Sequence, residues 1–179
     1  MKVPLEIQKI RDPDGISHFK AIISFQDAIA HTSQSQKLIQ IQNEYTRHVD
    51  DWQRLLKEIR SNRRCMADSH LQWKLADDIY LFIKFIENDG YIFANVSEAL
   101  SRDVGMSKSQ LNYLIKFRTH YPSIDLVSKE VNWSKYRELM DFPDQQTRKQ
   151  CEALIKAGRI KADKEIREFK SKLKKDRIL

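Results

Sequence analysis

The sequence has few of the residues that interrupt regular secondary structure. Only 4 Gly and 4 Pro occur among 179 residues, whereas hydrophobic residues make up 41% and charged residues 32% of the chain. A chain with so few turn formers favours long helices, and one of this length can bury a core that needs no disulfides. The composition therefore predicts a mainly α, multi-helix fold.

Cysteines and long apolar runs are also scarce. Cys65 and Cys151 lie far apart without C-x-x-C spacing, which argues against a disulfide framework or a zinc knuckle and favours a reducing compartment. The longest apolar stretch, residues 79–86, is interrupted by Lys84, and the amino-terminal residues lack the apolar run of a signal peptide. We therefore expect a cytoplasmic protein without a membrane segment.

Signatures of catalysis are missing too. The sequence contains no glycine-rich phosphate loop and no G-x-S-x-G motif. Its five histidines are scattered, and Asp77 and Asp78 are adjacent on an expected helix, so their side chains point in different directions. We expect neither a metal site nor a cofactor, and no enzymatic activity.

The positive charge is concentrated at one end of the chain. The net charge is +7, and residues 143–179 hold 12 basic and 6 acidic side chains. Such a segment suits contact with phosphates, although a solvated lysine-rich helix explains it equally well. We divide the chain into three parts: an amino-terminal hairpin and long helix in residues 1–66, a helical core in residues 67–142 and basic helices in residues 143–179.

Residues 1–66 predict a small β-hairpin followed by a long helix. Apolar and polar residues alternate on both sides of a turn at residues 12–15 (Asp-Pro-Asp-Gly), and two strands alone need a further partner. Between residues 35 and 64, apolar residues from Leu38 to Ile59 follow heptad spacing. This stripe fits an amphipathic helix packed on the core better than a coiled-coil dimer seam.

Four further helices follow from capping residues and apolar spacing. One is expected from Asp68 or Ser69 to residues 88–90 (Asn-Asp-Gly), and a short one over residues 133–140. Asp144 can cap a helix that runs to Ala157, and Asp163 can cap the last helix.

The stretch from Leu100 to Phe117 predicts two helices joined by a tight turn. Leu100 and Val104 supply apolar residues four apart, and Gly105 stands where the chain must reverse through a positive φ. Ser107 can cap the second helix, whose inner stripe would be Leu111, Leu114 and Ile115. The outward side of the second helix carries residue types that bind phosphates or read base edges in a major groove. Together with the cap, the predicted DNA-binding residues are Ser107, Lys108, Ser109, Gln110, Asn112, Tyr113 and Lys116.

This stretch resembles the helix-turn-helix DNA-binding superfamily. The resemblance rests on Ser101, Val104, Gly105, Met106, Ser107 and Leu111, with Ser101 where that superfamily usually has alanine. It implies that the second helix is a recognition helix. A purely structural helical hairpin is the alternative.

A second, wider likeness involves residues 132–139 (Asn-Trp-Ser-Lys-Tyr-Arg-Glu-Leu). They are similar to a region that follows the helix-turn-helix in some restriction-like nucleases, and more faintly to the helical DNA-binding region of ParB-type partition proteins. This likeness implies binding without cleavage, and we expect no nuclease domain. For Trp133 and Tyr136 themselves, packing in the core is favoured over stacking on bases.

Together these patterns predict sequence-specific binding of double-stranded DNA in a regulatory, plasmid-partition or mobile-element role. Because one helix-turn-helix contacts few base pairs, we expect a homodimer, associated with the nucleoid. Phosphate contacts are expected from Arg118, Lys170, Lys172, Lys174, Lys175 and Arg177. The alternative is a non-enzymatic helical assembly subunit whose basic carboxy-terminal helix binds an acidic protein or RNA.

Overall fold

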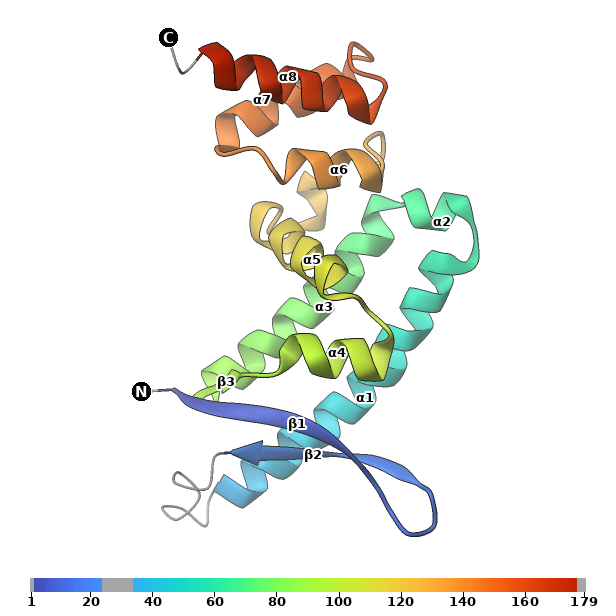
Figure 1. The fold of residues 1–179 in the computed structure, drawn as a ribbon, viewed down its shortest axis with the longest axis vertical. Helices are drawn as coiled ribbons and strands as arrows, with labels where there is room; N and C mark the ends of the chain where they lie inside the picture. The colour runs from blue at the N-terminus through green and yellow to red at the C-terminus, as the bar shows by residue number, and fades with distance from the viewer. Residues whose placement is uncertain (1, 24–33, 177–179) are drawn as a thin grey trace. The chain divides into compact units, whose positions relative to one another are not determined.

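The computed structural model describes residues 2–23 and 34–176, which form eight α-helices and a three-stranded sheet (Figure 1). This confirms the predicted mainly α fold with amino-terminal strands. The chain divides into two compact units, one made of Met1–Lys57 and Asp77–Leu111, the other of Glu58–Ala76 and Asn112–Leu179. None of the described helices combines the length and apolarity that crossing a lipid bilayer requires.

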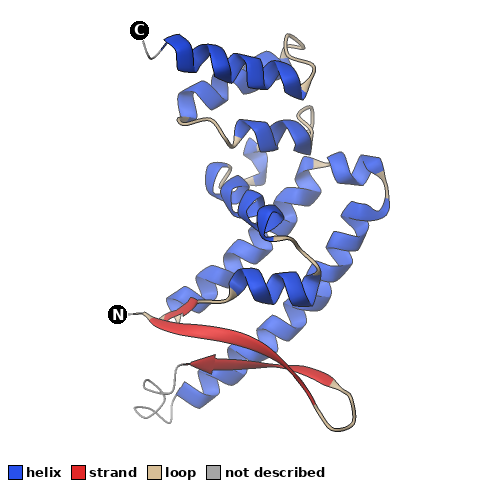
Figure 2. Ribbon diagram, viewed as in Figure 1, coloured by secondary structure: helices blue, strands red, loops and turns tan. Residues whose placement is uncertain are grey.

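The predicted hairpin is present at the start of the first unit (Figure 2). Strands β1 (Val3–Arg11) and β2 (Ser17–Ile23) pair antiparallel. In the turn between them, the Gly15 N–H donates to the Asp12 carbonyl at 2.8 Å, and Gly15 has a φ of 81°. The turn chemistry of the sequence therefore correctly located both strands.

A third strand, β3 (Tyr91–Phe93), pairs in parallel with β1 and places β1 at the centre of the sheet. Asn95 lies two residues after β3, and its side-chain amide continues the pairing with β1. The amide oxygen accepts from the Ile7 N–H and the amide nitrogen donates to the Ile7 carbonyl, each at 3.0 Å. The hairpin thus gains its additional partner from within the chain.

The long helix α1 (Gln34–Ser61) buries Tyr45 and Trp52 of its apolar stripe in the first unit, whereas Leu38 and Leu55 are half-buried. The Tyr45 ring lies 5.7 Å from that of Phe82 in α3 (Ser69–Asn88) and 6.0 Å from that of Phe93. The core-packing interpretation of the heptad stripe is therefore confirmed for its buried residues. The helix ends earlier than expected because Asn62 caps a separate short helix, α2 (Arg63–Ala67), by accepting from the Cys65 N–H at 2.9 Å.

The second unit has its own aromatic core. Phe117, Tyr136 and Trp133 pack there, with the Phe117 ring 5.0 Å from Tyr136 and 5.1 Å from Trp133. The core role expected for Trp133 and Tyr136 is thus confirmed. Both side chains belong to α6 (Trp133–Leu139), which packs against α7 (Gln145–Lys156) and α8 (Asp163–Asp176) (Figure 1).

The two carboxy-terminal helices begin differently. Asp144 caps α7 as predicted, since its carboxylate accepts from the Thr147 N–H at 2.7 Å. The prediction for Asp163 was wrong by one position: Asp163 is already helical, and the Glu165 carboxylate accepts from the N–H groups of Lys161 and Ala162. A glutamate three residues inside a helix can reach back in this way to free donors before it.

Candidate nucleic-acid interface

A tight turn at residues 105–107 joins α4 (Val96–Val104) to α5 (Lys108–His120). Gly105 caps α4 with a left-handed φ of 73°, and its N–H donates to the Ser101 carbonyl at 3.2 Å. The Ser107 hydroxyl accepts from the Gln110 N–H at 3.2 Å and caps α5. The predicted roles of Gly105 and Ser107 in this turn are confirmed.

Asp103 fixes the end of α4 just before the turn. Its side chain is fully buried, accepts from the Tyr45 hydroxyl at 2.8 Å and pairs with the Arg102 guanidinium. Burial and the neighbouring Asp103 carboxylate raise the pKa of Tyr45, which keeps this hydroxyl a donor. The Asp103 carbonyl also accepts from the Gln53 side chain at 2.6 Å. This carboxylate is therefore compensated inside the first unit and is not presented to a polyanion.

The predicted recognition residues occupy accessible positions. The buried stripe of α5 consists of Leu111, Leu114 and Phe117, whereas Ile115, which we expected to be buried, is only half-buried. Phe117 takes its place because the helix turns 100° per residue, so positions 111, 114 and 117 share one face. Among the predicted contacts, the half-buried residues are Gln110 and Tyr113, and the exposed ones are Ser107, Lys108, Ser109, Asn112 and Lys116.

Within the second unit, two cations approach the ring of Tyr113, one from another helix and one from α5 itself. The Arg137 guanidinium of α6 lies 4.7 Å from the centroid of the Tyr113 ring, with the Lys116 ammonium at 5.9 Å. A cation over an aromatic face is attracted by the ring quadrupole, so Tyr113 holds Arg137 in a defined position.

The Asp141 carboxylate connects α5 to α8. It lies 3.7 Å from the Lys116 Nζ and 3.9 Å from the Lys170 Nζ. A second ion pair joins Arg167 of α8 to Glu138 of α6 at 3.6 Å. We name this group of side chains the basic surface: Asn112, Tyr113, Lys116, Arg137, Asp141, Arg167 and Lys170. It contains four cations and one carboxylate, with Glu138 at its edge, so its net charge is positive.

The predicted phosphate contacts have different surroundings. The Arg118 guanidinium lies 5.4 Å from the centroid of the Trp73 ring, while Lys170 belongs to the basic surface and Lys172 is exposed. Lys174 and Lys175 lie on α8 at positions whose side chains the structure does not describe, and Arg177 lies outside the described residues.

Sequence reasoning included Arg137 only in the likeness of residues 132–139, and it predicted neither Arg137 nor Asp141 as a contact residue. The spacing of the buried Tyr136, Leu139 and Met140 could have indicated that Arg137 points outward. No local pattern could have placed it over a ring of another helix, because that contact spans 24 positions of the chain.

Among the described residues, no group of three or more histidine, cysteine, aspartate or glutamate side chains is arranged to hold a metal ion. Comparison with known proteins gives no match to any family model, curated protein or solved structure.

Proposed function

We propose that this protein binds double-stranded DNA in a sequence-specific manner, with α5 as its recognition helix. The observation that carries the proposal is the turn at Gly105 and Ser107, which is followed by a helix with accessible amide and lysine side chains. Gln and Asn can bond adenine bidentately, and Lys can bond guanine or a phosphate. Regulatory, partition and mobile-element roles are all compatible with this activity.

The basic surface supports the same proposal by supplying affinity that base contacts alone do not give. Its four cations lie on α5, α6 and α8, so phosphate contacts and base contacts would both involve α5. Lys and Arg that neutralise phosphates release condensed counterions and strengthen binding at low salt. The division of roles is that α5 reads bases while the cations around it hold the backbone.

The test begins with selection of a preferred duplex from a random pool, followed by affinity measurements across a range of salt concentrations. Gln110→Ala combined with Asn112→Ala should reduce preference for the selected duplex by about tenfold or more, because each bidentate base contact discriminates by about 1–3 kcal/mol. Lys172→Ala should instead lower the slope of log K against log salt by about 0.9, with sequence preference retained.

Lys57→Ala is the matched control, since Lys57 is an exposed cation on α1 and the substitution removes the same charge. It should leave both the slope of log K against log salt and the sequence preference unchanged. Unchanged preference in the α5 double variant would defeat the recognition-helix assignment. Binding to RNA or to an acidic protein in place of DNA would favour the alternative of an assembly subunit.

We also propose that the active species is a homodimer. One recognition helix contacts only a few base pairs, and a dimer binds two half-sites about one helical turn apart. Because the central residues of the α1 stripe, Tyr45 and Trp52, are buried in their own chain, we place the dimer contact on other surfaces. Sedimentation of the protein as a monomer, both free and on the selected duplex, would exclude this proposal.

A further inference from the structure

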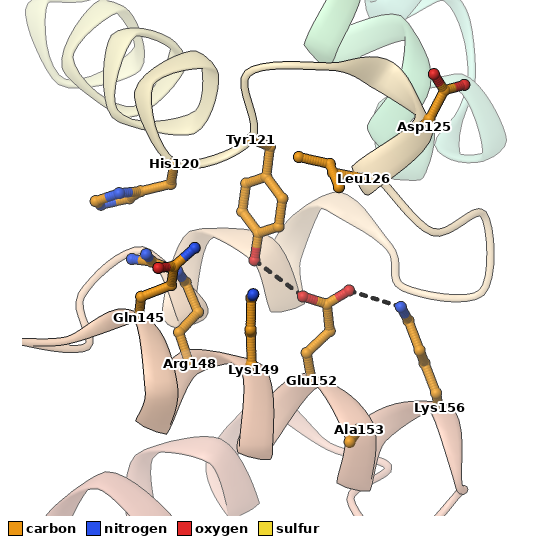
Figure 3. A pocket seen from close by; sticks show the side chains of 10 residues that line it. All are labelled: His120, Tyr121, Asp125, Leu126, Gln145, Arg148, Lys149, Glu152, Ala153 and Lys156. Atoms are coloured by element: carbon orange, nitrogen blue, oxygen red, sulfur yellow. Dashed lines mark hydrogen bonds and ion pairs between the residues drawn. The ribbon is translucent and has the colours of Figure 1, made fainter.

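We propose that a pocket in the second unit binds a small molecule with a terminal phosphate group. The α7 pocket, as we name it, lies among the end of α5, the short helix η1 (Ile124–Leu126) and one side of α7 (Figure 3). Its volume is about 360 Å³, which is within the range of small-ligand sites. Its lining includes His120, Tyr121, Gln145, Arg148, Lys149 and Lys156. The inference does not depend on DNA binding.

Arg148 is the central observation. It is only 6% exposed, and no hydrogen bond or ion pair reaches its guanidinium from the described residues. Arginines buried to this degree are almost always paired, because an unsatisfied buried charge is costly. Here the side chain lines a cavity instead, and Figure 3 shows it extending from α7 toward His120. Its N–H donors are therefore available for the oxygens of a ligand.

The carboxylate one turn further along α7 does not compensate Arg148. Glu152 is occupied by the Lys156 ammonium at 2.8 Å and by the hydroxyls of Tyr121 at 3.2 Å and Tyr136 at 3.4 Å. The other acidic side chain of the lining, Asp125, accepts from the Ser123 hydroxyl and lies apart from Arg148 in Figure 3. The pocket thus keeps an excess of positive charge.

The excess of positive charge affects the pKa of the His120 side chain. Burial and the positive charges of Arg148 and Lys116 lower the pKa of His120, so the ring is neutral at pH 7. A bound anion would offset the repulsion from Arg148 and raise that pKa, which gives binding a signature at a named side chain.

The charge and shape of the pocket favour a phosphate monoester. Arg148 and the exposed Lys149 have no anionic partner among the described residues, and two cations match the charge of about −2 that a monoester carries near neutral pH. The first turn of α7 also contributes the positive end of a helix dipole, although Asp144 already caps it. The nearly enclosed Arg148 is poorly reached by the internal phosphodiesters of a duplex, which lie on a broad convex surface.

The test titrates the full-length protein with inorganic phosphate and with glycerol 3-phosphate. Calorimetry measures the affinity, and imidazole NMR follows the pKa of His120. Wild type should bind both ligands with an increase in the pKa of His120. Arg148→Gln should weaken binding by about tenfold or more, the effect of losing charge-assisted hydrogen bonds, and Arg148→Lys by less.

Lys149→Gln protects the test against misfolding of the Arg148 variants, because Lys149 is exposed, and it should weaken binding by about threefold to tenfold. Lys164→Gln, an equal charge change at an exposed position of α8, should have no effect. Unaltered binding in folded Arg148→Gln and Lys149→Gln would overturn the proposal, as would tighter binding of malonate than of phosphate.

A separate arm distinguishes a free phosphate from one in DNA. In phosphate-free buffer, Lys149→Gln should leave duplex affinity unchanged. If duplex affinity falls while neither small phosphate binds, the pocket serves the nucleic-acid backbone, and the small-molecule proposal is wrong. Loss of duplex binding in the α5 double variant with phosphate binding retained would refute the proposed function alone.

Discussion

Gly105 shows how one residue sets the geometry of a candidate site. Its φ of 73° is unfavourable for any residue with a Cβ, yet a Cβ built there would meet nothing within 4 Å. The cost of substitution is therefore conformational and not steric. We predict that Gly105→Ala lowers the free energy of unfolding by about 1–2 kcal/mol, as measured by urea denaturation.

Gly105→Asn should cost less than Gly105→Ala, because asparagine tolerates the left-handed region better than alanine. Ser101→Ala, at an exposed position of α4, is the control and should change stability by no more than about 0.5 kcal/mol. Equal stability of wild type and Gly105→Ala would contradict the conformational role assigned to the glycine.

Two helices of the first unit are joined by a polar contact that responds to pH. The Asp78 carboxylate of α3 contacts two side chains of α1. It accepts from the Trp52 indole N–H at 2.5 Å and lies 3.0 Å from the His48 ring nitrogen. Partial burial raises the pKa of Asp78, but the hydrogen bonds from His48 and Trp52 and the charge of His48 outweigh it, so the pKa lies below its ordinary value of 3.8.

A carboxyl group with a lowered folded-state pKa stabilises the fold above its unfolded pKa and loses that contribution as the pH falls through the folded value. We predict that stability measured from about pH 5 to about pH 2, a range that includes the ordinary pKa of 3.8, declines less steeply in Asp78→Asn than in wild type. Asp50→Asn, at an exposed position of α1, should retain the wild-type slope. An Asp78→Asn slope equal to that of wild type would show that the carboxylate is not coupled to folding.

At the scale of the whole molecule, the features that the sequence predicted correctly are those that depend on neighbouring residues along the chain. Gly15 and Gly105 both adopt the positive φ that their positions required, and Asp144 caps the helix assigned to it. The strand β3 was not predictable, because three residues are too few to show a period and its partner β1 is almost 90 positions away. The same holds for the stacking of Arg137 on Tyr113.

The α7 pocket was hidden for a related reason. In the sequence, Arg148 is one more cation of a basic helix. Only tertiary packing shows that it is buried without an acidic partner in the part of the chain that the structure describes. The candidate recognition residues, by contrast, follow the period of a single helix and could be placed from spacing alone. Sequence reasoning thus located surfaces that belong to one element and missed those assembled from several.

The position of Asp141 between Lys116 and Lys170 has a consequence for how long the protein stays on DNA. If α5 binds DNA as proposed, this carboxylate competes with every phosphate for the same two ammonium groups, so it weakens binding to any duplex alike. Every complex then dissociates sooner, and only a duplex with good base contacts is retained for long.

We predict that Asp141→Asn raises affinity for selected and arbitrary duplexes alike by about threefold to tenfold, so that the ratio of the two affinities is unchanged. Asp51→Asn on α1, with an equal change in charge, should leave both affinities unaltered. Unchanged affinity in Asp141→Asn would show that the two lysines do not contact the backbone. In this protein, a single acidic side chain would then act against the cations beside it to keep each complex with DNA short-lived.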